Sequence, residues 1–105
     1  MIQETTVTEL HALKQKKADI LILDVREPNE YQICQIGGKL IPIQELPNRL
    51  DELDKNKKII VHCRSGGRSR QAVEFLQSQG FTQVSNLTGG IRAWIEQIEP
   101  TMTTY

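Results

Sequence analysis

The stretch that decides the fold reads Ile59-Ile60-Val61-His62-Cys63-Arg64-Ser65-Gly66-Gly67-Arg68-Ser69. Its first half is a short apolar run, which predicts a buried strand that ends at Cys63. The two glycines that follow allow the backbone to turn tightly, and a helical pattern then continues to Gln79. The sequence therefore predicts a cysteine held between the carboxyl end of a strand and the start of a helix.

This setting favours negative charge at the cysteine. The N–H groups of a curled loop and of a helix N-terminus point toward the same place, and both attract anions. Arg64 and Arg68 add full positive charge nearby. Such surroundings lower the pKa of a thiol and hold an anion against its sulfur. A free cysteine is often only a small buried residue, but that role does not account for the glycines and arginines around Cys63.

Length and composition predict a single domain over residues 1–105, without nucleic-acid or membrane partners. The chain has 105 residues with 38% hydrophobic and 25% charged residues, within the range of globular domains. Its formal net charge is zero, so the bulk charge favours neither nucleic acids nor acidic membranes. No apolar run reaches the roughly 18 residues of a membrane span. The N-terminus lacks the pattern of a signal peptide, which predicts a cytoplasmic protein, and a monomer is the default expectation.

The two cysteines, Cys34 and Cys63, lie far apart in unlike contexts. In a reducing compartment they are not expected to form a disulfide. Neither the cysteines nor His11 and His62 have the spacing of a zinc site, so the sequence predicts neither a metal nor a cofactor. Cys34 lies among apolar residues and is expected to be buried.

The first half of the chain alternates helix and strand. Thr6 and Glu9 match a capping box, which predicts a helix to about Lys16. The apolar run 20–23 predicts a strand, and Pro28 suits the first turn of a short helix through residue 33. Residues 40–41 predict another short strand. Leucines at 46, 50 and 53 then predict a helix entered at position 47.

The second half repeats the alternation around the central strand. Gly80 suits the end of the helix that follows the loop, and residues 84–87 predict the last strand. A final helix is expected to end at Pro100, with residues 99–105 as a loose tail. The whole pattern predicts an α/β fold with an open, mostly parallel central sheet and helices on both faces. Ligands of such sheets bind beyond the carboxyl ends of the strands, where Cys63 and Asp24 are expected.

Three motifs in order give the chain a resemblance to a single rhodanese domain, a sulfurtransferase fold. They are Asp24-Val25-Arg26-Glu27-Pro28-Asn29-Glu30-Tyr31, the loop that begins at Cys63, and Leu87-Thr88-Gly89-Gly90-Ile91-Arg92-Ala93-Trp94. One motif alone is a weak signal, whereas three at the expected separations are specific. The resemblance covers about residues 6–98.

The resemblance implies an enzyme with Cys63 as its nucleophile. Cys63 would take sulfane sulfur from thiosulfate or a protein persulfide, become a persulfide, and pass the sulfur to a thiophilic acceptor. The substrate-binding residues would be those that complete the loop, with backbone N–H donors around the anion and arginine charge beside it; they are Arg64, Ser65, Gly66, Gly67, Arg68 and Ser69. Cell-cycle phosphatases of related fold have five residues between cysteine and arginine. Here four lie between Cys63 and Arg68, which favours sulfur over a phosphate ester.

Asp24 and Arg26 are expected to have a structural role, as a charge pair or as hydrogen-bond partners that hold the loops near Cys63. Because side chains alternate along a strand, His62 is expected to point away from the site. A thiolate needs no general base, so the sequence does not require one.

One segment departs from the family pattern. The chain has Gln35-Ile36-Gly37-Gly38-Lys39 where rhodaneses commonly have His-Ile-Pro-Gly-Ala. With Cys34 before it, this variant resembles the rhodanese domains that end adenylyltransferases acting on ubiquitin-like sulfur carriers. The chain would then be an excised sulfur-donor domain, with the carrier as acceptor. The alternative from another class is an interaction or anion-sensing module with a rhodanese fold. Inactive members usually lack the cysteine, so Cys63 favours the enzyme.

Overall fold

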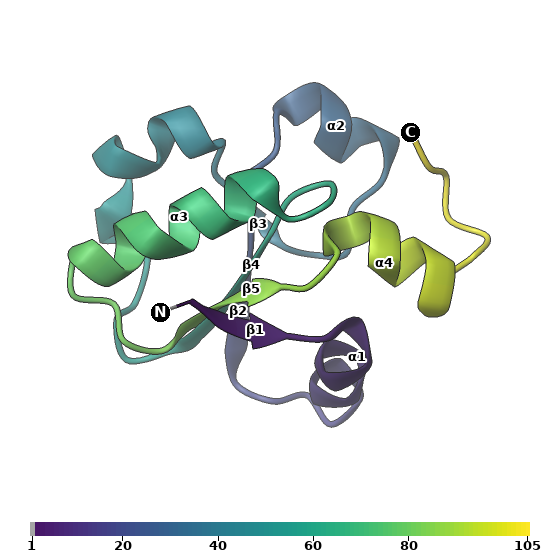
Figure 1. Cartoon of the computed structure of the whole chain (residues 1–105), viewed down its shortest axis with the longest axis horizontal. Coiled ribbons are helices and arrows are strands. Elements are labelled where there is room, and N and C mark those ends of the chain that lie inside the picture. The colour runs from purple at the N-terminus through teal and green to yellow at the C-terminus, as the bar shows by residue number, and fades with distance from the viewer. Residues whose placement is uncertain (1) are drawn as a thin grey trace.

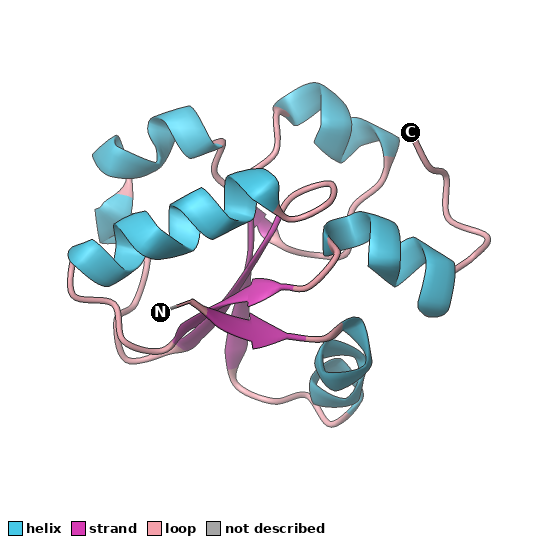
Figure 2. Ribbon diagram, in the orientation of Figure 1, coloured by secondary structure: helices cyan, strands magenta, loops and turns pink. Residues whose placement is uncertain are grey.

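The computed structural model describes residues 2–105 and contains a parallel sheet covered by helices on both faces (Figure 2). Within these residues the sheet has five strands in the order β1-β5-β4-β2-β3. The strands are Gln3–Thr5 (β1), Ile20–Asp24 (β2), Lys39–Leu40 (β3), Lys58–His62 (β4) and Val84–Leu87 (β5). Every neighbouring pair is parallel. The predicted α/β fold is confirmed, and all carboxyl ends meet at one edge of the sheet.

Strand β4 occupies the centre and fixes the direction of the side chains that lead to the cysteine. Ile59 and Val61 pack with Cys63 into the core on one face of the sheet. Ile60 packs into the core on the other face. This alternation places His62, which follows Val61, on the face opposite to Cys63, as predicted.

Two layers of helix cover the sheet (Figure 1). Helix α3 (Gly67–Ser78) covers the face of Cys63, together with the 3-10 helices Ile43–Asn48 (η1) and Leu50–Glu52 (η2). Helices α1 (Val7–Gln15) and α4 (Gly90–Gln97) cover the opposite face and contact each other. The short helix α2 (Pro28–Ile33) follows β2 near the carboxyl edge.

Local signals in the sequence set several helix ends. The Thr6 hydroxyl accepts a hydrogen bond from Glu9 N at 3.1 Å, and Thr6 N donates to Glu9 Oε1 at 2.8 Å, so the predicted capping box is confirmed. After α3, Gly80 adopts a φ of +91°. Phe81 N then donates to the carbonyl of Leu76 at 3.0 Å, which ends the helix as predicted.

Two predictions of local structure differ from the observed fold. The leucine pattern at 46–53 predicted one helix entered at Pro47, but the segment forms η1 and η2 with Pro47 inside η1. Proline has no N–H and clashes with the preceding turn, so a continuous α-helix is disfavoured there. Strand β1 was not predicted, because its residues Gln3 and Glu4 are exposed and polar.

The end of the chain also differs from the prediction of a loose tail. Residues 101–105 belong to no strand or helix, yet Tyr105 is half-buried and forms hydrogen bonds to side chains near the site. Among residues 2–105, no helix is both long and apolar enough to cross a membrane.

Candidate functional site

The sulfur of Cys63 is surrounded by polar groups of its own loop. The residue follows β4 directly and is only 1% exposed. Gly66 N donates a hydrogen bond to Sγ at 3.1 Å, and the Ser69 hydroxyl lies 3.4 Å from the same sulfur. Gly66 has a φ of +120°, a conformation that other residues rarely adopt, and α3 begins at the next residue. Glycine at this position lets the chain turn its N–H groups back onto the sulfur.

Hydrogen bonds lower the pKa of the Cys63 thiol. Burial alone would raise the pKa of the Cys63 thiol. The Ser69 hydroxyl and the backbone N–H groups of Ser69, Gly66 and Ser65 outweigh this effect, so the pKa lies below its ordinary value. A larger thiolate fraction makes the sulfur a better nucleophile near neutral pH.

A buried polar chain holds Ser69 in place. Ser69 is fully buried, and its hydroxyl lies within hydrogen-bond distance of Asn86 Oδ1 as well as of the Cys63 sulfur, so these two acceptors share its single proton. Asn86 Nδ2 in turn donates to the carboxylate of Glu4 at 3.2 Å. Sequence reasoning missed both Asn86 and Glu4. Asn86 interrupts the apolar character of β5 beside the central strand, which is the signal that could have identified it.

The predicted anion-binding arginine, Arg68, already has an anionic partner. Its two terminal nitrogens lie 2.7 and 2.9 Å from the two carboxylate oxygens of Glu30. Hydrogen bonds from Arg68 hold the pKa of Glu30 at about 2, and those to Glu30 raise the pKa of Arg68. Glu30 was not singled out from the sequence, although it belongs to the first of the three motifs.

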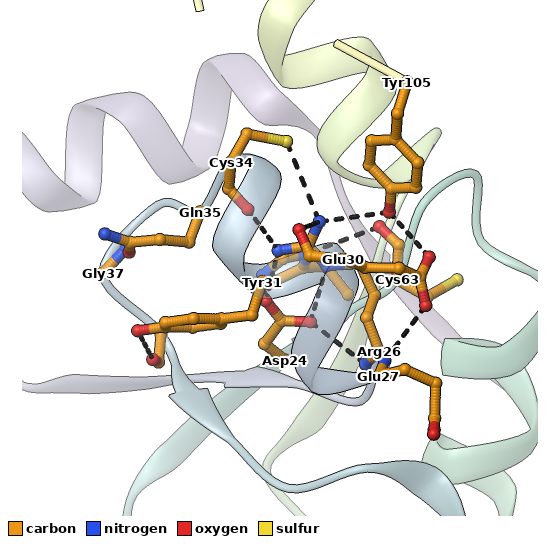
Figure 3. A network of polar contacts seen from close by, with 12 residues as sticks. Asp24, Arg26, Glu27, Glu30, Tyr31, Cys34, Gln35, Gly37, Cys63 and Tyr105 are labelled. Carbon is orange, nitrogen blue, oxygen red and sulfur yellow. Dashed lines mark hydrogen bonds and ion pairs between the residues drawn. The ribbon is translucent and has the colours of Figure 1, made fainter. Parts of the chain in front are cut away.

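Tyr105 joins this cluster from the end of the chain (Figure 3). Its hydroxyl donates to Glu30 Oε2 at 2.8 Å and accepts from Arg26 Nη1 at 3.1 Å. The guanidinium of Arg64 lies 4.8 Å from the centre of the Tyr105 ring and also donates to its backbone carbonyl. Arg64 itself is exposed.

Asp24 and Arg26 form a fully buried ion pair. Arg26 Nη2 lies 2.6 Å from Asp24 Oδ2, and Arg26 Nε donates to Oδ1 at 2.9 Å. Arg26 also donates to the carbonyl of Cys34 at 2.8 Å, so the pair connects the end of β2 to the end of α2. In the described part of the chain, neither Asp24 nor Arg26 is hydrogen-bonded to Cys63. Cys34 is 7% exposed, and both cysteines are free.

His62 is fully buried beside the ion pair. Its Nε2 lies 3.6 Å from Asp24 Oδ2 and has no hydrogen-bond partner. Burial lowers the pKa of His62, and the positive charge of Arg26 lowers it further, against the opposing effect of Asp24. His62 is therefore a neutral neighbour of the pair.

The N-terminus of α4 is hydrogen-bonded to the backbone of the loop. Ile91 N donates to the carbonyl of Cys63 at 2.9 Å, and Arg92 N donates to that of Arg64 at 3.0 Å. Gly90 makes this approach possible, because a Cβ there would lie 2.5 Å from the Arg64 carbonyl oxygen and 2.6 Å from that of Cys63. The third motif thus fixes the backbone of the loop.

The remaining loop residues differ in their exposure to solvent. Ser65 and Gly67 are exposed, whereas Gly66 is buried. Within the part of the chain that the structure describes, no three histidine, cysteine or acidic side chains are grouped to hold a metal ion. The site thus offers a buried thiol of lowered pKa with N–H donors and charged side chains around it.

Residues 6–97 match the rhodanese-like domain family. The chain belongs to the rhodanese family. It is 37% identical to a sulfurtransferase from Allochromatium vinosum, over 90% of this chain and 89% of that protein. It is 32% identical to the adenylyltransferase and sulfurtransferase MOCS3 of Arabidopsis thaliana, over 92% of this chain but 25% of that protein. The chain spans 38% and 51% of the length of two other curated relatives.

A solved structure agrees with this assignment. The rhodanese-related protein from Thermoplasma volcanium is 36% identical, with a TM-score of 0.83 over 93% of this chain and 95% of that one. The fold and the family predicted from the three motifs are therefore confirmed. The roles of individual site residues stay predictions.

Proposed function

We propose that the protein is a sulfurtransferase that carries sulfane sulfur on Cys63 as a persulfide. The thiolate attacks the outer sulfur of the donor, and the bond between that sulfur and the rest of the donor breaks. With thiosulfate the leaving group is sulfite, and with a protein persulfide it is a thiolate. A thiophilic acceptor then removes the outer sulfur and regenerates the thiolate.

The observation that carries this proposal is the contact of Gly66 N with the sulfur at 3.1 Å, inside a loop that also lowers the pKa of Cys63. The same N–H donors suit a persulfide anion, since they are oriented before the charge arrives. Membership of a family whose members include sulfurtransferases supports the same chemistry.

The acceptor we favour is the C-terminus of a ubiquitin-like sulfur carrier. Relatives support this choice, because one is named an adenylyltransferase and sulfurtransferase and another a putative sulfur carrier protein. We expect the protein to work as a monomer in the cytoplasm.

The test is thiosulfate:cyanide sulfur transfer by the wild type and by Cys63→Ser. Thiocyanate formed by the wild type alone supports the enzyme and its nucleophile. Intact mass after incubation with donor gives a second readout, a gain of about 32 Da for one covalently bound sulfur. A folded wild type that gains no sulfur from thiosulfate or from a persulfide would favour the alternative, a binding module with this fold.

A further inference from the structure

The Arg68 guanidinium already holds an anionic group of the protein itself. Both of its terminal nitrogens contact Glu30, in the two-pronged arrangement that is the strongest geometry for an arginine and a carboxylate. The side chains are 36% and 14% exposed, so the pair is partly shielded from water and salt. The positive charge of Arg68, which was predicted to bind an anionic substrate, is therefore compensated by Glu30.

Glu30 is held in this position by further hydrogen bonds. Glu27 N donates to Oε1 at 3.0 Å as part of the capping box of α2, and the Tyr105 hydroxyl donates to Oε2 at 2.8 Å. Each carboxylate oxygen thus accepts from Arg68 and from one other donor. Removing Glu30 from Arg68 would cost all of these contacts, so an incoming anion does not simply take its place.

The pair lies next to the reacting sulfur. Arg68 lies in the first turn of α3 directly before Ser69, whose hydroxyl is 3.4 Å from Sγ, so the pair belongs to the loop around the sulfur. The negative charge of Cys63 also contributes to the raised pKa of Arg68. A carboxylate on that guanidinium adds negative charge where a donor must approach. Thiosulfate brings two negative charges to this place and releases sulfite, which also carries two, whereas a protonated persulfide brings none.

We propose that Glu30 is a specificity-determining residue that turns Cys63 away from thiosulfate and toward persulfide donors. This inference rests on the sulfurtransferase function proposed above. In the favoured step, the Cys63 thiolate attacks the outer sulfur of R–S–SH. The new S–S bond forms with the electron pair of the thiolate, the old one breaks, and R–S⁻ leaves while the proton stays on the transferred sulfur. No oxidant or reductant is consumed.

The experiment measures the rate at which Cys63 gains one sulfur from two donors, by rapid quenching and intact mass. The donors are thiosulfate and N-acetylcysteamine persulfide, which has no charged group apart from the persulfide itself. The proteins are the wild type, Glu30→Gln and Asp19→Asn. Asp19 is a matched control, since its side chain is 86% exposed at the amino end of β2, away from the carboxyl edge.

We expect Glu30→Gln to load up to about fivefold faster from thiosulfate, the effect of one partly screened charge. Loading from the persulfide should stay within about twofold of the wild type on the same reasoning, because the protonated form that the thiolate attacks is uncharged. Asp19→Asn should resemble the wild type with both donors. Glu30→Asp keeps the charge, so it should retain the preference of the wild type and show that the effect is electrostatic.

Slower or unchanged loading of Glu30→Gln from thiosulfate would overturn the inference, because Glu30 would then serve to position Arg68 for the anion. Equal changes with both donors would also overturn it, since they would indicate a structural role. A folded wild type that gains no sulfur from either donor would refute the sulfurtransferase proposal itself, and the inference with it.

Discussion

Replacement of Arg26 by methionine tests what holds the carboxyl edge of the sheet together. Arg26 and Asp24 are both 0% exposed, and the guanidinium is the cationic partner that the Asp24 carboxylate contacts. Removing one member of a buried ion pair typically costs about 3–5 kcal/mol, because the other charge stays buried without compensation. For a chain of 105 residues this corresponds to a fall in Tm of about 15–20 °C.

The loss should depend on pH through His62, whose Nε2 lies 3.6 Å from Asp24 Oδ2. In the wild type, burial and then Arg26 act to keep the pKa of His62 below its ordinary value of 6.5. Without Arg26 that pKa rises, and a protonated His62 can replace the lost cation. In the wild type the folded pKa lies below the unfolded one, so His62 destabilises the protein slightly as pH falls below 6.5. In the variant the folded pKa lies closer to the unfolded one, so this loss at low pH is smaller.

Urea denaturation at pH 5 and at pH 8 measures both effects. We expect Arg26→Met to lose less stability relative to the wild type at pH 5 than at pH 8. Arg92→Met is the control, since the side chain of Arg92 is 60% exposed and lies 3.9 Å from Glu96; it should change the free energy of unfolding by less than about 1 kcal/mol at either pH. A loss below about 1 kcal/mol for Arg26→Met would refute the argument about the buried pair. A loss that is equal at both pH values would refute the role of His62.

Two further predictions concern the loop itself. Ser69→Ala removes a hydroxyl that helps to lower the pKa of Cys63 against the effect of burial, so alkylation of the Cys63 peptide by iodoacetamide at pH 7 should become slower, and its pH profile should move to higher pH; an unchanged pH profile of alkylation would contradict this. Gly90→Ala places a Cβ 2.5 Å from the Arg64 carbonyl oxygen, so it should cost more than about 3 kcal/mol in urea denaturation. Gly37→Ala is its control, because Gly37 has a φ of +83°, near the +62° of Gly90, but no atom within 4 Å of the added Cβ, and it should cost only about 1–2 kcal/mol. Equal losses for the two variants would show that the contact with the loop backbone does not matter.

Features that depend on local sequence were predicted well. The apolar runs of β2 and β4, the cap at Thr6 and the stop at Gly80 are each encoded within a few residues. Strand β1 escaped prediction because its stability comes from pairing with β5, about 80 residues away, and not from its own exposed side chains. In the segment 43–52, Leu46 is buried, but the helix type differs from the prediction. The spacing of the leucines does not reflect the missing N–H of Pro47.

The groups that lower the pKa of Cys63 were predicted only in part. The sequence predicted the backbone N–H groups of the curled loop, which contribute, and also the charge of the arginines, but it does not show which arginines are paired with a carboxylate. In the structure Arg68 is neutralised by Glu30, 38 positions earlier, and the groups that lower the pKa against burial are the Ser69 hydroxyl and three backbone N–H groups. Pairing between distant charges is a tertiary property, whereas the loop conformation follows from its glycines. The sequence therefore predicts that an anion binds here, but it predicts less well which groups bind it. A donor that needs N–H groups alone is better matched to this site than one that needs a free arginine.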